Sequence, residues 1–142
     1  MDNFIYETPT KVYFGKDEEQ KIGKIIREFH PKKVLIHYGG GSVRKTGLLD
    51  RVEGYLNAEG IPFVELGGVV PNPELPLVRE GIALGRREGV DFVLAVGGGS
   101  VMDSSKAIAN GIANPETDVW DFSLGKALPA RTLPKGAILT LA

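Results

Sequence analysis

The chain has 142 residues and a formal net charge of −1, with 42% hydrophobic and 25% charged residues. This balance is ordinary for a globular domain, and it excludes the basic field that nucleic acids or anionic membranes attract. There is no cysteine, so disulfide bonds and thiolate metal ligands are excluded. The apolar runs are too short for a membrane span and the first residues lack the features of a secretory signal, so we expect a cytoplasmic protein.

Apolar runs of strand-like length recur along the chain, and turns rich in glycine or proline separate them. The first run stops at Gly15, and Asp17 is then expected to cap the next helix. The predicted strands are residues 12–14, 33–38, 62–66, 92–96 and 137–141.

Between these runs the apolar residues recur at helical spacing. Pro31 should end the first helix, and Asn72 and Pro73 should be the N-cap and first residue of the third. The second helix is predicted from about residue 43 or 46 to 59, the third to about 89, and the fourth to about 113, whereas residues 114–135 are mostly turn and polar residues. The predicted buried face of the first helix is Ile22, Ile25, Ile26 and Phe29.

Strands therefore alternate with helices over almost the whole chain. This alternation predicts an α/β fold, with a Rossmann-like, mainly parallel sheet covered by helices on both faces. The length suits one domain with its own core.

His30 and His37 are the two histidines of the chain, so a metal site with several imidazole ligands would have to use this pair. His30 precedes Pro31 at the end of a predicted helix, whereas His37 lies within an apolar strand. These settings do not suggest a shared site. We therefore expect a helix-end histidine and a packed structural histidine rather than metal ligands.

The pentapeptide Gly-Gly-Gly-Ser-Val occurs twice, at residues 39–43 and 97–101, each time after an apolar strand and before a helix. Glycine allows positive φ and leaves no Cβ between the chain and a ligand, and the amides at a helix start attract anions. The hydroxyl groups of Ser42 and Ser100 can donate hydrogen bonds to phosphate oxygens. Because such turns lie at the carboxyl edge of an open α/β sheet, we predict a phosphate-binding site there.

The alternative is a pair of tight strand-to-helix turns that bind nothing. Neither copy is the G-x-G-x-x-G fingerprint, because Arg44 and Met102 occupy the third glycine position. Neither copy is a Walker A loop, because the Gly-Lys-Ser/Thr ending is missing. The glycine pattern by itself therefore indicates phosphate binding but no particular nucleotide.

The second copy continues as Gly97-Gly98-Gly99-Ser100-Val101-Met102-Asp103-Ser104-Ser105-Lys106. This run resembles the GGGSxxDxxK signature of iron-containing (group III) alcohol dehydrogenases and their dehydroquinate synthase-like relatives. Residues 8–16, 71–73 and 138–142 are similar to the same family. Residues 38–47 resemble its NADP(H)-dependent butanol dehydrogenase and aldehyde reductase branch, and the likeness covers essentially the whole chain.

The resemblance implies a role for each matching position. The second glycine turn would bind the cofactor pyrophosphate, Asn72 would lie near the adenosine or its ribose, and Thr140 and Leu141 would touch the cofactor near an interdomain cleft. Asp103 and Lys106 would lie near the ribose and nicotinamide end, unless they are a first-turn acid favoured by the helix dipole and a solvated lysine. The expected cofactor-binding residues are Gly39, Gly40, Gly41, Ser42, Asn72, Gly97, Gly98, Gly99, Ser100, Asp103, Lys106, Thr140 and Leu141.

The resemblance also implies a function: hydride transfer between NADP(H) and a primary alcohol or aldehyde such as butanol or butanal, with Fe²⁺ or Zn²⁺ in the full-length enzyme. The family's metal ligands, one aspartate and three histidines, lie in a helical C-terminal domain, so no catalytic or metal-ligand residue is assigned in this sequence. We expect residues 1–142 to be the dinucleotide-binding domain of a homodimeric enzyme and to be inactive in isolation. The alternatives are a non-catalytic nucleotide-binding module and a glycerol or polyol dehydrogenase or cyclising synthase relative.

Position 39 bears on the choice of cofactor. In NAD-using dinucleotide folds an acidic residue at a strand end binds the ribose 2′-hydroxyl, and NAD-preferring relatives in this family carry an aspartate where Gly39 stands here. Gly40, Gly41 and Ser42 can instead surround a 2′-phosphate, and Arg44 or Lys45 adds positive charge unless both are only solvated helix residues. We therefore predict a preference for NADP(H), with NAD(H) as the alternative cofactor.

Overall fold

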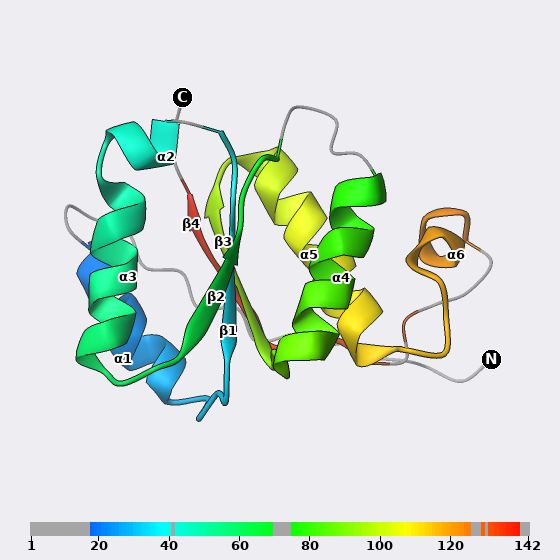
Figure 1. Ribbon diagram of the computed structural model, residues 1–142, viewed down its shortest axis with the longest axis horizontal. Helices are drawn as coiled ribbons and strands as arrows, with labels where there is room; N and C mark the ends of the chain where they lie inside the picture. The colour runs from blue at the N-terminus through cyan, green and yellow to red at the C-terminus, as the bar shows by residue number, and fades with distance from the viewer. Residues whose placement is uncertain (1–17, 41, 70–74, 126–128, 130, 140–142) are drawn as a thin grey trace, which may run out of the picture.

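The computed structural model of the chain describes residues 18–40, 42–69, 75–125, 129 and 131–139. Within these residues a parallel sheet lies between helices on both faces (Figure 1), which confirms the predicted Rossmann-like α/β fold. The elements in chain order are the 3-10 helix η1 (Glu18–Lys21), α1 (Ile22–Arg27), β1 (Val34–Tyr38), α2 (Ser42–Lys45), α3 (Leu48–Ala58), β2 (Phe63–Leu66), α4 (Leu75–Glu88), β3 (Phe92–Gly97), α5 (Gly99–Ala113), α6 (Val119–Ser123) and β4 (Lys135–Leu139).

The sheet has the strand order β2-β1-β3-β4, and every neighbouring pair is parallel. The chain passes from β1 to β2 on one side and then crosses back to β3 on the other side of β1. This reversal makes the gap between β1 and β3 the topological switch point, where ligands of open α/β sheets bind outside the carboxyl ends of the strands.

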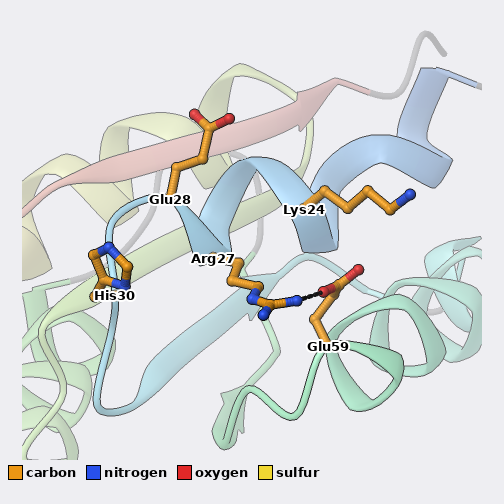
Figure 2. A pocket seen from close by; sticks show the side chains of 5 residues that line it. All are labelled: Lys24, Arg27, Glu28, His30 and Glu59. Atoms are coloured by element: carbon orange, nitrogen blue, oxygen red, sulfur yellow. Dashed lines mark hydrogen bonds and ion pairs between the residues drawn. The ribbon is translucent and has the colours of Figure 1, made fainter.

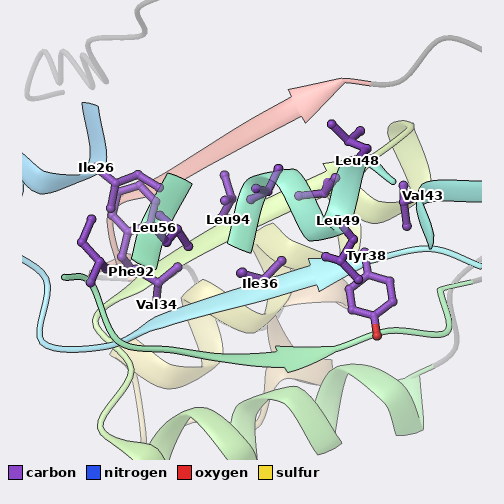
Figure 3. Close-up of a cluster of buried hydrophobic side chains, with 13 residues drawn as sticks. Ile26, Val34, Ile36, Tyr38, Val43, Leu48, Leu49, Leu56, Phe92 and Leu94 are labelled. Atoms are coloured by element: carbon purple, nitrogen blue, oxygen red, sulfur yellow. The ribbon is translucent and has the colours of Figure 1, made fainter. Parts of the chain in front are cut away.

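Side chains of the two central strands enter two separate cores. Val34, Ile36 and Tyr38 of β1 pack with α1 and α3 on one face (Figure 3), whereas Leu35 and Val93 pack with α4 and α5 on the other. Every residue of β1 and β3 is buried. A strand covered on both faces reads as a continuous apolar run, which is why these two strands were plain in the sequence.

Glycines allow the helices on each face to approach closely. On the α4–α5 face, a Cβ added to Gly81 would lie 2.5 Å from Cδ1 of Ile108, and a Cβ added to Gly111 would collide with Ile82. On the other face, a Cβ added to Gly23 of α1 would collide with the main-chain oxygen of Tyr55 in α3. At their closest points, the helices of each pair therefore contact each other at glycines rather than through interdigitated large side chains.

Several elements differ from the sequence predictions. The second helix is divided into α2 and α3, because Gly47 adopts a left-handed φ of +75° between them. The placement of Phe29 on a buried helix face is wrong: α1 ends at Arg27, and Phe29 is 55% exposed with its ring edge against Phe92 at a centroid distance of 5.3 Å. β4 begins two residues earlier than predicted. The predicted strand at 12–14 and the proposed caps at positions 17 and 72 lie outside the described residues.

Helix α6 was not predicted at all. It begins after Asp118, whose carboxylate accepts a hydrogen bond from the Trp120 amide at 2.8 Å, an N-cap signal present in the sequence. The five-residue helix is too short to show apolar periodicity, so the surrounding turn residues dominated the interpretation. None of the helices in the described ranges has the length and apolar character needed to cross a bilayer.

His37 is the largest polar side chain in the core, and it is fully buried on the α4–α5 face of β1. Its Nδ1 lies 2.8 Å from the main-chain oxygen of Leu66, and its Nε2 lies 2.8 Å from Oγ of Ser104. A carbonyl oxygen can only accept, so Nδ1 carries the proton and Nε2 accepts from the Ser104 hydroxyl. Burial lowers the pKa of His37, which favours this neutral form. His37 is thus a packed structural histidine, as expected.

We predict opposite effects for one substitution at two helical glycines. Gly23→Ala should lower the free energy of unfolding by roughly 1–3 kcal/mol, because the new Cβ meets backbone that cannot easily move. Gly54→Ala on α3 should raise it by about 0.5–1 kcal/mol, because nothing lies within 4 Å of the new Cβ and alanine favours helix. Urea denaturation measures both values. A Gly23→Ala protein as stable as wild type would contradict the close approach of α1 to α3.

We also predict that the titration of His37 lowers the stability of the fold as the pH is lowered. An unfolded histidine has a pKa of 6.5 and burial lowers that value in the folded state. Below pH 6.5 the unfolded chain therefore binds more protons than the folded chain. As the pH is lowered, the free energy of unfolding decreases until the pH lies below the pKa of His37 in the folded state. His37→Gln, which does not titrate, should have a shallower decrease. Denaturation midpoints measured from pH 7.5 to 5 test this, and parallel curves for the two proteins would refute it.

Candidate functional site

The fold brings the two copies of the repeated glycine turn side by side. β1 and β3 are neighbours with Tyr38 in register with Val96, so Gly39, just after β1, and Gly97, the last residue of β3, lie at adjacent strand ends. Val101, in the first turn of α5, packs against both. A Cβ on Gly39 would lie 3.5 Å from Cγ2 of Val101, and a Cβ on Gly97 would lie 2.7 Å from the same atom. The repeat therefore forms one structural unit at the switch point.

The glycines in this unit fall into two classes. Gly97 has a φ of +150°, and a side chain there would press on Val101, so the fold itself requires glycine. Gly40, Gly98 and Gly99 have no left-handed φ, and a Cβ on any of them would meet nothing within 4 Å. Neither the backbone nor the packing of the described residues demands glycine at these three positions. At Gly98 and Gly99 the missing side chains leave open space at the start of α5.

The start of α5 offers uncapped amides to this open surface. The first turn's hydrogen bonding begins where the Met102 amide donates to the Gly98 oxygen at 3.1 Å, so the amides of Gly99, Ser100 and Val101 have no intrahelical acceptor. Gly98 provides no side-chain cap, and the first turn contains no acidic residue. The helix has 15 residues, long enough for its dipole to add a favourable potential for an anion.

Asp103 and Lys106 follow on the same helix, and both side chains are exposed. The suggestion that Asp103 is only a first-turn acid is not supported, because it is the fifth residue of α5. Within the described residues neither side chain makes an ion pair or a hydrogen bond. Helix geometry places Lys106 about 10 Å along the axis from Gly99, so this pair would reach a different part of an extended ligand than the helix start does.

Arg44, after the first glycine turn, is held in place rather than simply solvated. Its guanidinium donates a hydrogen bond to the Tyr38 hydroxyl and lies 5.1 Å from the centre of the Tyr38 ring. The hydrogen bond and the negative potential of the tyrosine raise the pKa of Arg44. Lys45 is exposed. A fixed cation therefore stands at the carboxyl end of β1.

Two carboxyl groups modify the field around that cation. Glu53 of α3 hydrogen-bonds to Glu65 of β2, and this contact, followed by burial and by repulsion from Glu65, raises the pKa of Glu53 to about 7. The Arg44 charge acts on Glu53 in the opposite direction. The raised pKa leaves Glu53 partly protonated near pH 7, whereas Glu65 acts as a negative charge on both Glu53 and Arg44.

Other predicted positions are not tested by the structure. Gly41, Asn72, Thr140 and Leu141 lie outside the described residues, and Ser42 begins α2 without a described side chain. In the part of the chain that the structure describes, no three histidine, aspartate or glutamate residues are grouped to hold a metal ion.

His30 lines a pocket of about 450 Å³ beside the amino end of β1, away from the glycine turns (Figure 2). An ion pair of 2.8 Å between Arg27 and Glu59 crosses this pocket. The other residues that line it are Lys24 and Glu28. The pocket has neither a glycine turn nor a helix start, so it contributes nothing to the candidate site.

Sequence reasoning missed the contacts that connect the two turns. Val101 was part of the repeated motif, but its contact with both Gly39 and Gly97 depends on the pairing of β1 with β3. The hydrogen bond that Ser104 donates to His37 had a weak signal in the sequence, namely a polar residue inside an otherwise apolar strand. Only the fold identifies its partner.

Comparison with known proteins agrees with this geometry. The family model "Iron-containing alcohol dehydrogenase" matches residues 9–142. The chain is 47% identical over 142 residues to the probable NADH-dependent butanol dehydrogenase 2 of Bacillus subtilis, covering 100% of this chain and 36% of that protein. It is 42% identical over 144 residues to the NADPH-dependent aldehyde reductase YqhD of Escherichia coli, covering 99% of this chain and 36% of that protein.

A solved structure shows the same likeness. The NADH-dependent butanol dehydrogenase A of Thermotoga maritima superposes with a TM-score of 0.91 at 45% identity, covering 100% of this chain and 35% of that chain. This chain thus spans about a third of the length of the relatives that it matches. The family match and the shared fold confirm the resemblance found in the second glycine turn: the chain belongs to the iron-containing alcohol dehydrogenase family.

Proposed function

We propose that this chain is the cofactor-binding domain of a metal-dependent alcohol dehydrogenase or aldehyde reductase. The full-length enzyme would transfer hydride between NAD(P)H and a primary alcohol or aldehyde such as butanol or butanal. The observation that carries the proposal is the open surface at the start of α5, where Gly98 and Gly99, which the fold does not need as glycines, lie beside uncapped helix amides. A pyrophosphate fits this surface, because side chains there would occupy its space and the amides supply donors for its oxygens.

The residues of the chain bind and orient the cofactor in this proposal. The amides of Gly99 and Ser100 donate to the pyrophosphate, the Ser100 hydroxyl adds a further donor, and the α5 dipole adds favourable potential. Asp103 and Lys106 extend toward the ribose and nicotinamide end. When bound, the nicotinamide supplies the hydride chemistry.

The metal belongs to another part of the enzyme. The described residues contain no group of ligands that fits iron or zinc, and the matched relatives are nearly three times as long as this chain. In line with the family resemblance, we place the metal ligands in a C-terminal helical domain outside residues 1–142. The full-length protein would be a cytoplasmic homodimer.

The preference for NADP(H) over NAD(H) is part of the proposal. Four relatives of 40–47% identity are named as NADH-dependent butanol dehydrogenases and one of 42% identity as an NADPH-dependent aldehyde reductase, so likeness does not support the preference for NADP(H). The support comes from the end of β1, where Gly39 leaves no carboxylate to repel a 2′-phosphate and Arg44 is fixed nearby by Tyr38. The raised pKa of Glu53, about 7, reduces the negative charge of that one carboxyl group near Arg44.

Substitutions at the second glycine turn test the placement of the pyrophosphate. In the full-length protein, Gly98→Val and Ser100→Glu should weaken NADPH binding by at least about 100-fold, through lost space and through repulsion between like charges. Gly98→Val should still fold, since nothing lies within 4 Å of the added Cβ. Gly54→Val, equally open but on α3, is the matched control. Calorimetric titration and circular dichroism give affinity and fold, and wild-type affinity in a folded Gly98→Val or Ser100→Glu protein would refute the placement.

A substitution at the first turn tests the cofactor preference. Gly39→Asp should lower kcat/KM for NADPH sharply and raise the relative use of NADH, because the carboxylate repels a 2′-phosphate and accepts from a 2′-hydroxyl. The new Cβ would sit 3.5 Å from Val101 and 3.6 Å from the Val69 oxygen, which are ordinary contacts, so the fold should tolerate it. A wild type that favours NADH by about tenfold, or roughly 1.4 kcal/mol, or a variant with the wild-type ratio, would show that this turn does not read the 2′ position.

A further inference from the structure

We propose that His37 is a positioning residue for the phosphate-binding edge, and that it acts through Ser104 on the start of α5. The inference deepens the proposed function and rests on it, because it assigns the orientation of the cofactor-binding amides to a residue that touches no cofactor.

The geometry places His37 at the meeting point of three segments of the carboxyl edge. It lies in β1, two residues before Gly39, and its Nε2 accepts from the Ser104 hydroxyl of α5 at 2.8 Å. Its Nδ1 donates to the Leu66 oxygen at 2.8 Å, and Leu66 is the last residue of β2. Within the described residues, the bond to Ser104 is the one side-chain hydrogen bond that joins β1 to α5. One imidazole therefore connects both strand ends to the helix.

Because Ser104 lies near the start of α5, its hydrogen bond to His37 can fix the orientation of the helix start. Val101 lies about one turn before Ser104 and packs against Gly39 and Gly97, one residue from each glycine turn. Val101, Ile108 and Ala109 of α5 pack in apolar clusters with strand residues, and apolar contacts have little directional preference. A hydrogen bond is directional, so the bond from Ser104 to His37 sets the rotation of α5 and hence the direction of its free amides.

Apolar packing alone does not account for a histidine at this position. β1 is buried along its whole length, and burying a polar ring costs free energy unless its nitrogens are hydrogen-bonded. A branched apolar side chain would suit the strand better. Ala95, the register partner of His37 on β3, is small. What histidine adds is a donor and an acceptor at opposite edges of one rigid ring, matched here to Leu66 and Ser104.

Variants of the full-length protein separate the two bonds. Ser104→Ala removes the bond to α5 with little change in volume. His37→Gln carries its amide near the place of Nε2 and can keep the Ser104 bond, whereas His37→Asn carries its amide near the place of Nδ1 and can keep only the Leu66 bond. Asn114→Ala is the matched control: Asn114 is equally buried, and its amide donates to the oxygens of Asn110 and Arg131 at the far end of α5.

The readouts are the Kd for NADPH, the KM for NADPH, kcat and the urea midpoint. We expect Ser104→Ala and His37→Asn to raise the Kd and KM about tenfold, the effect of one lost hydrogen bond, while kcat changes less than about twofold. His37→Gln should stay within about threefold of the wild-type Kd, since it keeps the bond to α5. Asn114→Ala should lower the urea midpoint and leave the Kd unchanged.

Two results would overturn the inference alone: a Ser104→Ala protein that binds NADPH as tightly as wild type, or an Asn114→Ala protein that loses affinity to the same degree. The second result would show that any weakening of the fold impairs binding. A wild-type protein that binds neither NADPH nor NADH would overturn the proposed function itself, and the inference with it.

Discussion

The contact of one valine with two glycines organises the carboxyl edge of this domain. Val101 occupies the space that a side chain at Gly97 would take and lies within ordinary contact range of a Cβ at Gly39, so two turns that are far apart in the sequence meet at the first turn of α5. This contact exists only because the strand order places β1 beside β3. The position of the free helix amides, and the open surface before them, both follow from it.

The glycines of the repeat are identical in the sequence, but the physical reason for having glycine differs from one position to another. Gly97 is needed by the fold, since its backbone is left-handed and its neighbour is in van der Waals contact. Gly98 and Gly99 are free of both constraints. Natural sequences tend to agree with their fold at every position, so residues that the fold does not require are informative about a ligand. This contrast supports a bound phosphate more strongly than the number of glycines does.

The electrostatic potential at the carboxyl edge depends on which titratable side chains are neutral as well as on which side chains are charged. Burial lowers the pKa of His37, and the contact with Glu65 raises the pKa of Glu53 to about 7, which reduces the charge of Glu53 near neutral pH. Arg44 keeps its full charge against the Tyr38 ring. The edge therefore presents helix amides and one fixed guanidinium, and amides and a guanidinium are groups that favour a phosphate.

The sequence by itself determined the alternation of strands and helices, the doubly covered sheet and the glycine-rich edge, because local apolar periodicity and turn residues carry that information. It also indicated the family through the run from Gly97 to Lys106. It misplaced Phe29 and missed α6, where a short element gives too little periodicity to detect. Only the tertiary structure decided three features: the strand order, the contact of Val101 with both turns and the hydrogen bond that Ser104 donates to His37. Each joins residues that are distant in the chain, and no local pattern specifies which buried partner a side chain will meet.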